Sequence, residues 1–350
     1  MSSVGNKGDQ PSLYFSDLAT GKMTKVEVPA SGALGQNLTV TGFHWVNDQR
    51  IIFTTSGYGS FAVNRDGSNW QQLTGPGETY TTSTIFASEV AHVFADRSGK
   101  VLMLQRDYIG DHAKYPTVLE VNTLTGKTAG VAENIEEITR WVVDQSGRVR
   151  VGVNWNGEKT RVFYRESDDA AWRVLPGFSN DGLGSYPLAF DYDGQTVYTA
   201  ALTADGTWGL YAYDLTTQKQ GALIFSDPTY DIFNPGDLMG GRAGLIFSKK
   251  KRALVGLRYT TEVSQTVWFD AEMQQVQATL DQALPGVMNQ VVGWSDDENR
   301  ILVISWSDRQ PGVYYLLDRA TQELRRIVDR TAWIKPEQLA PTSPLKFRAR

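Results

Sequence analysis

The sequence contains no cysteine among its 350 residues. This absence excludes disulfide bridges, a cysteine nucleophile and zinc sites built from thiolate ligands. A chain without cysteine is compatible with an oxidising compartment as well as with a reducing one. The composition therefore leaves the localisation unknown, with cytoplasm and periplasm both open.

Long apolar runs and dense basic clusters are also lacking. No stretch approaches the roughly 18 consecutive apolar residues of a membrane-spanning helix, and the N-terminal MSSVGNKGDQPS has no apolar signal-peptide core. The formal net charge is −5, and the densest basic run is the short Lys249–Arg252, so no segment is suited to follow a phosphate backbone. We expect a soluble protein that binds neither a membrane nor nucleic acid.

The sequence does contain a repeat. A single core usually stops growing near about 250–300 residues, so this length favours two domains or a repeat architecture. Seven segments consist of an apolar or aromatic run followed by a polar turn, which in most copies begins with Asp or Asn, and they recur every roughly 43 to 58 residues. The segments are SLYFSDLATGK, SFAVNRDGSN, TVLEVNTLTGK, RVFYRESDDA, GLYAYDLTTQ, TVWFDAEMQ and VYYLLDRATQ, starting at residues 12, 60, 117, 161, 209, 266 and 313.

A second hairpin precedes six of these seven segments, as in FHWVNDQRIIFTT from Phe43 and VGWSDDENRILVIS from Val292. Four β-prone runs per repeat, strong turns and almost no helical periodicity predict an all-β fold. The repeat length predicts a seven-bladed β-propeller of four-stranded antiparallel blades. The first repeat has only its outer hairpin, at Leu13–Val28, so we predict that the first blade is incomplete.

An incomplete blade leaves an unpaired strand edge and an uncovered apolar face. Three arrangements would cover them: upstream residues of a longer chain, the C-terminal Pro344–Arg350 added as a strand, or a neighbouring molecule. We therefore expect the chain to dimerise through the incomplete blade, to exchange strands or to aggregate, unless the C-terminal segment pairs.

Ser295 raises the question of a serine nucleophile, because Gly293-Trp294-Ser295 matches the first half of the G-x-S-x-G elbow. The elbow also needs Gly two residues after the serine, where this sequence has Asp297. Ser295 further aligns with Val46 in the second repeat, which predicts a hairpin turn. The three histidines, at positions 44, 92 and 112, fall in separate predicted strands or loops, so no catalytic triad is predicted.

Several segments resemble the N-terminal propeller of bacterial prolyl oligopeptidase-type serine peptidases, a group that includes acylaminoacyl and dipeptidyl peptidases. The resemblance rests on FHWVNDQRIIF, GSFAVNRDGSNWQQLT, TRVFYRESDDAAWRVL and above all the closing GVYYLLDRATQELRRIVDRTAWIKPEQLAPTSPLKFRAR. In that family a similar W-I-x-P-x-Q-L-A-P segment leads from the last blade towards the α/β-hydrolase domain. The resemblance extends over essentially Leu13–Arg350.

The resemblance implies the organisation of the chain. Residues 1–11 would be a disordered leader, 12–330 the propeller, and 331–350 a linker leading to an α/β-hydrolase domain that is absent from this sequence. The nucleophilic Ser, the Asp and the His of the family all lie in that domain, so the resemblance assigns no catalytic residue here. The implied partners are the hydrolase domain of the same polypeptide and short peptides that the parent enzyme cleaves.

Two groups of residues are candidates for a site. Dipeptidyl peptidases of this family hold the ammonium group of the substrate's N-terminus with a propeller-borne pair of glutamates, so Glu136 and Glu137 are candidate substrate-binding residues, with an exposed acidic loop as the alternative. Arg106, Asp107 and His112 are expected in a polar loop that faces the hydrolase domain or only solvent. No cofactor or metal site is predicted, because the acidic turn at residues 296–298 lacks the spacing and glycine of a calcium loop.

Two functions remain open from the sequence. The first is a non-catalytic propeller that covers a peptidase active site and admits only short peptides. The second is a self-standing, protein-binding propeller of the Tol type. A reading frame that continues past Arg350 into a hydrolase domain would favour the first, and a stop codon there would favour the second.

Overall fold

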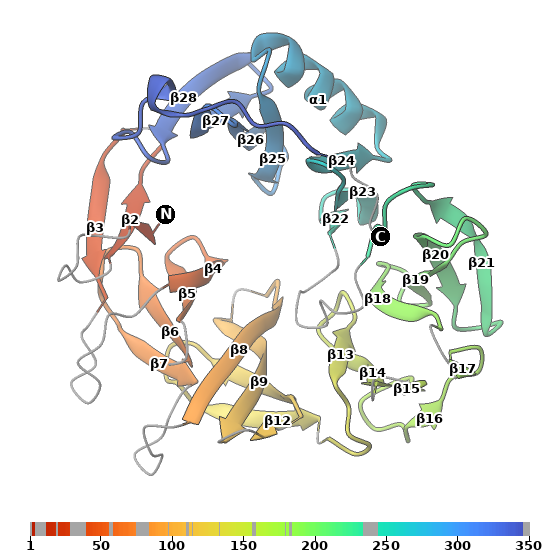
Figure 1. Cartoon of the computed structure of the whole chain (residues 1–350). Coiled ribbons are helices and arrows are strands. Elements are labelled where there is room, and N and C mark those ends of the chain that lie inside the picture. The colour runs from red at the N-terminus through yellow and green to blue at the C-terminus, as the bar shows by residue number, and fades with distance from the viewer. Residues whose placement is uncertain are drawn as a thin grey trace. The chain divides into compact units, whose positions relative to one another are not determined.

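The computed structural model describes residues 2–3, 12–18, 20–28, 40–55, 59–74, 84–96, 98–109, 112–113, 115–132, 134–155, 159–178, 180–181, 184–233 and 244–345. Its strands form a succession of antiparallel sheets along the chain (Figure 1). The fold is an all-β propeller in which six blades are seen, most of them four-stranded. The predicted fold class is confirmed at this level, whereas the predicted count of seven blades is not.

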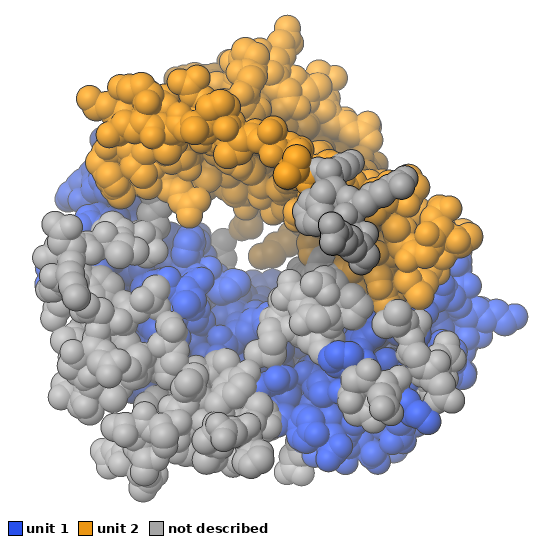
Figure 2. Space-filling model, in the orientation of Figure 1, with its two compact units in different colours: residues 1–201, 212–221, 236–241 blue, residues 202–211, 222–235, 242–350 orange. Residues whose placement is uncertain are grey.

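The chain divides into two compact units (Figure 2). Unit 1 comprises residues 1–201, 212–221 and 236–241, and unit 2 comprises residues 202–211, 222–235 and 242–350.

In unit 1 the sheet with order β4-β5-β6-β7 shows the regular blade. The Asn47 side chain accepts hydrogen bonds from the backbone N–H groups of Gln49 and Arg50, which closes the inner hairpin with an Asx turn. The strands are β4 (Val40–Asn47), β5 (Arg50–Thr55), β6 (Gly59–Asn64) and β7 (Gln71–Thr74).

Two five-stranded sheets follow in unit 1, each a four-stranded blade with one short additional strand. The first contains β8 (Thr84–Val93), β9 (Lys100–Ile109), β10 (His112–Ala113), β11 (Thr117–Asn122) and β12 (Thr128–Ala132). The second contains β13 (Arg140–Val143), β14 (Val149–Trp155), β15 (Lys159–Tyr164), β16 (Arg173–Val174) and β17 (Asn180–Asp181).

The N-terminal sheet has the order β1-β2-β3, with β1 (Ser2–Ser3), β2 (Ser12–Ser16) and β3 (Met23–Glu27). The predicted outer hairpin is present as β2 and β3. Ser2 and Ser3 pair with Leu13 and Ser12 of β2, and the division into a leader at residues 1–11, a propeller and a linker stays a prediction. The other residues of the leader segment lie outside the described part of the chain.

The next sheet has the order β18-β19-β20-β21, and its residues are divided between the two units. Unit 2 then contains a three-stranded sheet, a helix and a four-stranded sheet. The elements are β18 (Tyr186–Phe190), β19 (Thr196–Leu202), β20 (Trp208–Asp214), β21 (Lys219–Phe225), β22 (Leu245–Ser248), β23 (Ala253–Thr260), β24 (Ser264–Trp268), α1 (Ala271–Ala283), β25 (Met288–Trp294), β26 (Arg300–Ser307), β27 (Gln310–Asp318), β28 (Glu323–Asp329) and the 3₁₀ helix η1 (Pro336–Gln338).

Helix α1 corrects the sequence prediction, which placed a hairpin turn at Asp270 and a fourth strand after it. The Asp270 side chain instead accepts a hydrogen bond from the N–H of Met273 and caps the helix, which then buries Met273, Val276 and Leu280. These three residues have the 3–4 residue spacing of one helical face. The blade formed by β22, β23 and β24 therefore has a helix where the others have an outer strand.

The core lies between consecutive blades. In β5 the side chains of Ile51 and Phe53 belong to a cluster with Leu13 and Val26 of the N-terminal sheet. Ile52, between them in sequence, belongs to a second cluster with residues of β8 and β9 such as Val101. Because successive strand residues point to opposite faces, each blade contributes apolar side chains to two clusters.

Buried arginines join neighbouring blades in unit 1. Arg50 in β5 is 1% exposed. Its guanidinium donates to the Thr123 carbonyl of the next blade, with an Nε···O distance of 3.1 Å, and to the Asn64 side chain at 2.8 Å and the Asn69 carbonyl at 3.0 Å. One planar fork thus satisfies carbonyls of two blades at once.

We predict that Arg50→Lys destabilises the protein, because an ammonium group cannot make these divergent bonds and leaves buried carbonyls unpaired. The expected loss in the free energy of unfolding is about 2–3 kcal/mol, measured by urea denaturation. Arg65→Lys, a change at an exposed arginine of the same blade, is the control and should change stability little. Equal stability of the two variants would contradict a structural role for Arg50.

The segment after β28 contains η1 and no strand within residues 330–345. Trp333 is 72% exposed and Leu345 is 85% exposed, while the Thr342 N–H donates to the Asp308 carboxylate at 2.7 Å. The predicted role of this segment as a linker stays a prediction, and residues 346–350 lie outside the described part of the chain. The helices in the described segments are too short or too polar to cross a lipid bilayer.

Candidate functional site

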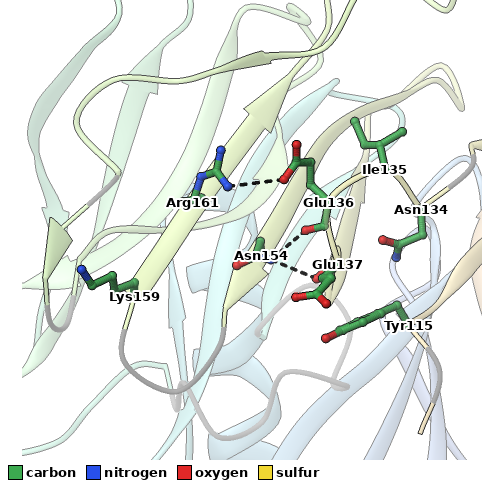
Figure 3. A pocket seen from close by; sticks show the side chains of 8 residues that line it. All are labelled: Tyr115, Asn134, Ile135, Glu136, Glu137, Asn154, Lys159 and Arg161. Atoms are coloured by element: carbon green, nitrogen blue, oxygen red, sulfur yellow. Dashed lines mark hydrogen bonds and ion pairs between the residues drawn. The ribbon is translucent and has the colours of Figure 1, made fainter.

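A pocket in unit 1 brings the two candidate glutamates together with basic and polar side chains (Figure 3). It has a volume of about 540 Å³. Its walls come from Tyr115, two residues before β11, the connection from β12 to β13, and strands β14 and β15. The lining residues are Tyr115, Asn134, Ile135, Glu136, Glu137, Asn154, Lys159 and Arg161.

Asn134 holds the connection that carries the glutamates. Its side-chain oxygen accepts from the Ile138 N–H at 2.8 Å, and its side-chain nitrogen donates to the Ile138 carbonyl at 2.8 Å and to the Pro116 carbonyl at 3.4 Å. Ile138 itself is fully buried between the two blades. The turn from Asn134 to Ile138 is therefore anchored at its end by the buried Ile138 side chain and closed by the side-chain amide of Asn134.

Asn154 of β14 fixes the middle of the turn. Its amide nitrogen donates to the carbonyls of Glu136 and Glu137, at 2.7 Å and 3.3 Å. Glu137 has a positive φ of 54°, a conformation that non-glycine residues adopt uncommonly outside turns. The backbone is thus held in place while both glutamate side chains stay exposed to solvent.

The two carboxylates have different surroundings. Glu136 forms an ion pair with Arg161, with an Nη1···Oε2 distance of 3.4 Å, and both side chains are 48% exposed. Glu137 has no hydrogen-bond or ion-pair partner for its side chain within the described residues, and it lines the pocket together with the Tyr115 side chain. The structure brings the predicted pair to one pocket, but the charge of Glu136 is already partly balanced. Their predicted role in substrate binding stays a prediction.

The second predicted group does not form a polar loop. Arg106 and Asp107 lie inside β9, which runs on to Ile109, and His112 begins the two-residue β10 that pairs back on β9. Arg106 donates to the Thr139 carbonyl of the next blade at 3.0 Å. The location in a loop is therefore wrong, because β9 pairs with β8 as far as its last residue, Ile109, opposite Thr84. A role at a domain interface stays a prediction.

Glu89 of β8 is a charged residue that the sequence analysis did not single out. Burial raises the pKa of its carboxyl group, and the charge of Arg140 in β13 opposes this rise. Arg140 is buried and donates to the Leu188 carbonyl at 3.3 Å. A glutamate within an alternating strand pattern resembles an exposed position, so only the packed structure reveals its burial.

Ser295 lies in the turn between β25 and β26 in unit 2, as predicted. Its hydroxyl donates to the Asp297 carboxylate at 2.5 Å and accepts from the Arg300 N–H at 3.0 Å. No histidine is among its described partners. This Asx-type turn explains the Ser-x-Asp spacing without a nucleophile. Within the described residues, no group of three or more His, Asp or Glu side chains is placed to hold a metal ion.

The comparisons with known proteins support the fold alone. No family model and no curated protein matches the sequence. Among solved structures, a prolyl endopeptidase is 13% identical with a TM-score of 0.53, over 91% of this chain and 46% of that one. A puromycin-hydrolyzing peptidase of Mycobacterium tuberculosis is 12% identical with a TM-score of 0.54, over 95% and 53%. A puromycin hydrolase is 15% identical with a TM-score of 0.54, over 94% and 52%. The chain thus spans about half the length of these three structures.

We predict that Asn134→Ala destabilises the protein by about 1–2 kcal/mol, because it leaves the N–H and carbonyl of buried Ile138 without their partner. Asn134→Asp keeps the acceptor for the N–H but places a carboxylate against two carbonyls, so it should destabilise at least as much. Thermal unfolding monitored by circular dichroism measures both variants. A stable Asn134→Asp protein would show that the turn does not depend on this amide.

We predict that Asp297 titrates near pH 2, because the Ser295 hydroxyl and the Asn299 N–H and side-chain amide lower the pKa of its carboxyl group to about 2. The stabilising contribution of this ionised turn is present above the ordinary pKa of 3.8 and is lost as the pH falls through about 2. Ser295→Ala should raise this pKa towards its ordinary value. Carbon-detected NMR titration of the carboxyl group measures both; an unchanged pKa in Ser295→Ala would contradict the assignment.

Proposed function

We propose that this chain is the non-catalytic propeller domain of a prolyl oligopeptidase-type serine peptidase and acts together with a hydrolase domain. The observation that carries the proposal is the coverage in the fold comparisons. More than nine-tenths of this chain aligns with peptidases of which it covers only about half. The remaining half of such an enzyme is where the proposed partner, the hydrolase domain, would be found.

The proposed role is selection of substrates by size and by their amino end. Blades that pack through continuous apolar clusters are rigid, and a rigid wall beside an active site excludes folded chains while extended peptides pass. Selection of this kind needs no catalytic group in the propeller. The pocket of Glu136 and Glu137 would add contacts to the peptide's N-terminal ammonium group.

The charges in the pocket support Glu137 as the principal contact. Its carboxylate lacks a partner within the described residues, whereas Arg161 competes for Glu136. A cation that enters the pocket therefore meets one free carboxylate and one that must be shared. Because both groups are solvated, the expected affinity for a single ammonium group is modest.

We predict that Glu137→Gln weakens binding of glycyl-phenylalaninamide about three- to tenfold, and that Glu136→Gln has a smaller effect. Isothermal titration calorimetry measures the binding. The control variant is Glu166→Gln, which makes the same charge change at an exposed glutamate of unit 1 outside the pocket. The control peptide is the N-acetylated form, which has no ammonium group.

For Arg161→Gln we predict the opposite change in peptide binding. It removes the competing cation from Glu136 and should tighten binding of the free-amine peptide while leaving the acetylated peptide unaffected. Equal binding of both peptides, or equal effects of the changes at Glu137 and Glu166, would exclude the pocket as an ammonium site. The domain assignment would survive that result; hydrolysis of peptides by this chain alone would overturn it.

The self-standing, protein-binding propeller of the Tol type stays the alternative. Its expected signature is a stable complex with a protein partner in the absence of any hydrolase domain. No contact in the described residues specifically favours it.

A further inference from the structure

The basic side chains of the pocket lie on one face of β15. Lys159, Arg161 and Phe163 alternate along this strand, so their side chains point to the same side. Phe163 is buried in the apolar cluster between this blade and the one before it. The guanidinium carbon of Arg161 lies 4.9 Å from the centre of the Phe163 ring, which is a cation–π contact. Stacking on a buried ring thus holds the Arg161 guanidinium at the wall of the pocket.

The acidic side chains come from the other wall of the pocket. Figure 3 shows Glu136 and Glu137 on the connection between β12 and β13, and Lys159 and Arg161 on β15. Asn154 lies between the two walls, and its amide nitrogen donates to the carbonyls of both glutamates. Two positive and two negative side chains give a formal charge of zero. The pocket is therefore neutral as a whole, but its positive and negative charges lie on different walls.

The Arg161 guanidinium is only partly used by Glu136. Their contact joins one nitrogen, Nη1, to one oxygen, Oε2, at 3.4 Å, and both side chains are 48% exposed. A guanidinium has five N–H donors, and it binds a carboxylate most strongly through two parallel bonds of about 2.7–2.9 Å. Within the described residues, the Arg161 guanidinium makes no further hydrogen bond. It therefore has donors available for a second carboxylate, one that comes from a ligand.

We propose that the pocket binds a dipeptide with both ends free, through Glu137 at the ammonium group and Arg161 at the carboxylate, with Lys159 as a second cation beside the carboxylate. The proposal rests on the ammonium site proposed above and adds the carboxylate half. In a free amino acid both charges are attached to one carbon, so a carboxylate at Arg161 would bring the ammonium group to Glu136, which already contacts Arg161. Two extended residues separate the charges by up to about 7 Å, which allows the ammonium group to reach past Glu136 to Glu137.

The carboxylate half makes the pocket selective for released dipeptides. A longer peptide with the same first two residues presents a neutral peptide bond to Arg161 and carries its carboxylate elsewhere. A dipeptide zwitterion also leaves the neutral pocket neutral, whereas a peptide that contributes only its ammonium group adds a net positive charge next to Lys159 and Arg161. In the proposed enzyme, a free dipeptide would therefore compete with longer peptides for this site.

The experiment compares glycyl-phenylalanine with glycyl-phenylalaninamide, which has a neutral amide in place of the carboxylate. Isothermal titration calorimetry on the full chain, at neutral pH and low salt, measures both. Glycyl-phenylalanine should bind about three- to tenfold more tightly than the amide. The tetrapeptide glycyl-phenylalanyl-glycyl-glycine, whose carboxylate lies further along the chain, should bind like the amide.

Three protein variants test the carboxylate half. Arg161→Gln should weaken glycyl-phenylalanine about three- to tenfold while it tightens the amide, because the acid loses its carboxylate contact and the amide loses only a competitor for Glu136. Lys159→Gln should weaken the acid to a smaller extent and should not weaken the amide. Lys127→Gln is the control, since this exposed lysine of unit 1 does not line the pocket, and it should change neither affinity. Circular dichroism checks that each variant is folded.

Equal affinity of the unaltered protein for the acid and the amide would overturn the proposal. A change in the same direction for both peptides in Arg161→Gln would do so as well. In either case the ammonium site stands if N-acetylation still weakens binding of the amide, so that only the carboxylate half fails. If N-acetylation has no effect on the binding of either peptide, the ammonium site of the proposed function fails, and the dipeptide assignment fails with it.

Discussion

The fold depends on blades that pack apolar side chains on both of their faces. In β5 alone, Ile51 and Phe53 enter one cluster and Ile52 enters another, so a blade without two neighbours exposes half of its apolar side chains. Apolar packing is not directional, whereas the hydrogen bonds of the buried Arg50 and Arg140 and the half-buried Arg106 are. Arg50, Arg106 and Arg140 each donate to a carbonyl of another blade in unit 1. The arginine hydrogen bonds thus fix how neighbouring blades are aligned, and the apolar clusters hold the blades together.

The candidate site follows from the same constraint. The chain must pass from the outer edge of one blade to the inner edge of the next, and the connection between β12 and β13 runs over the surface with its backbone groups to satisfy. Asn134 and Asn154 meet that need from opposite sides. Because the side-chain amides of Asn134 and Asn154 bond the backbone of this connection, the side chains of Glu136 and Glu137 are not needed for that role and line the pocket. The pocket is exposed, polar and electrically mixed, which suits a small polar ligand better than an apolar one.

The repeats and most of their turns could be predicted from sequence because the signals are local. Asp17 and Asn122 accept hydrogen bonds from backbone N–H groups two or three residues on, as an Asx turn requires. Asp270 stands at the same repeat position but caps α1, since an N-cap and an Asx turn use the same side-chain acceptor. Only the residues after Asp270 separate the two outcomes, because Met273, Val276 and Leu280 have the spacing of one helical face.

The position of Glu136 and Glu137 on a connection was also predictable, whereas its ion pair was not. Arg161 lies 25 residues away and reaches Glu136 only because β14 and β15 pair as they do. The strand location of Arg106 and Asp107 was missed for a related reason. Polar residues at the end of a long strand look like a loop until the pairing of β8 with β9 is known.

The short N-terminal sheet has a consequence for cooperativity. In an array of repeats, each unit is stabilised mainly by the interfaces with its neighbours, and a unit with part of an interface missing opens at lower free energy than the rest. The sheet of β1, β2 and β3 is such a terminal unit, and the opening of its strands would uncover Ile51 and Phe53 as well. The resistance of this chain to proteases is therefore set by the free energy needed to open its N-terminal sheet, and not by the average packing of its blades.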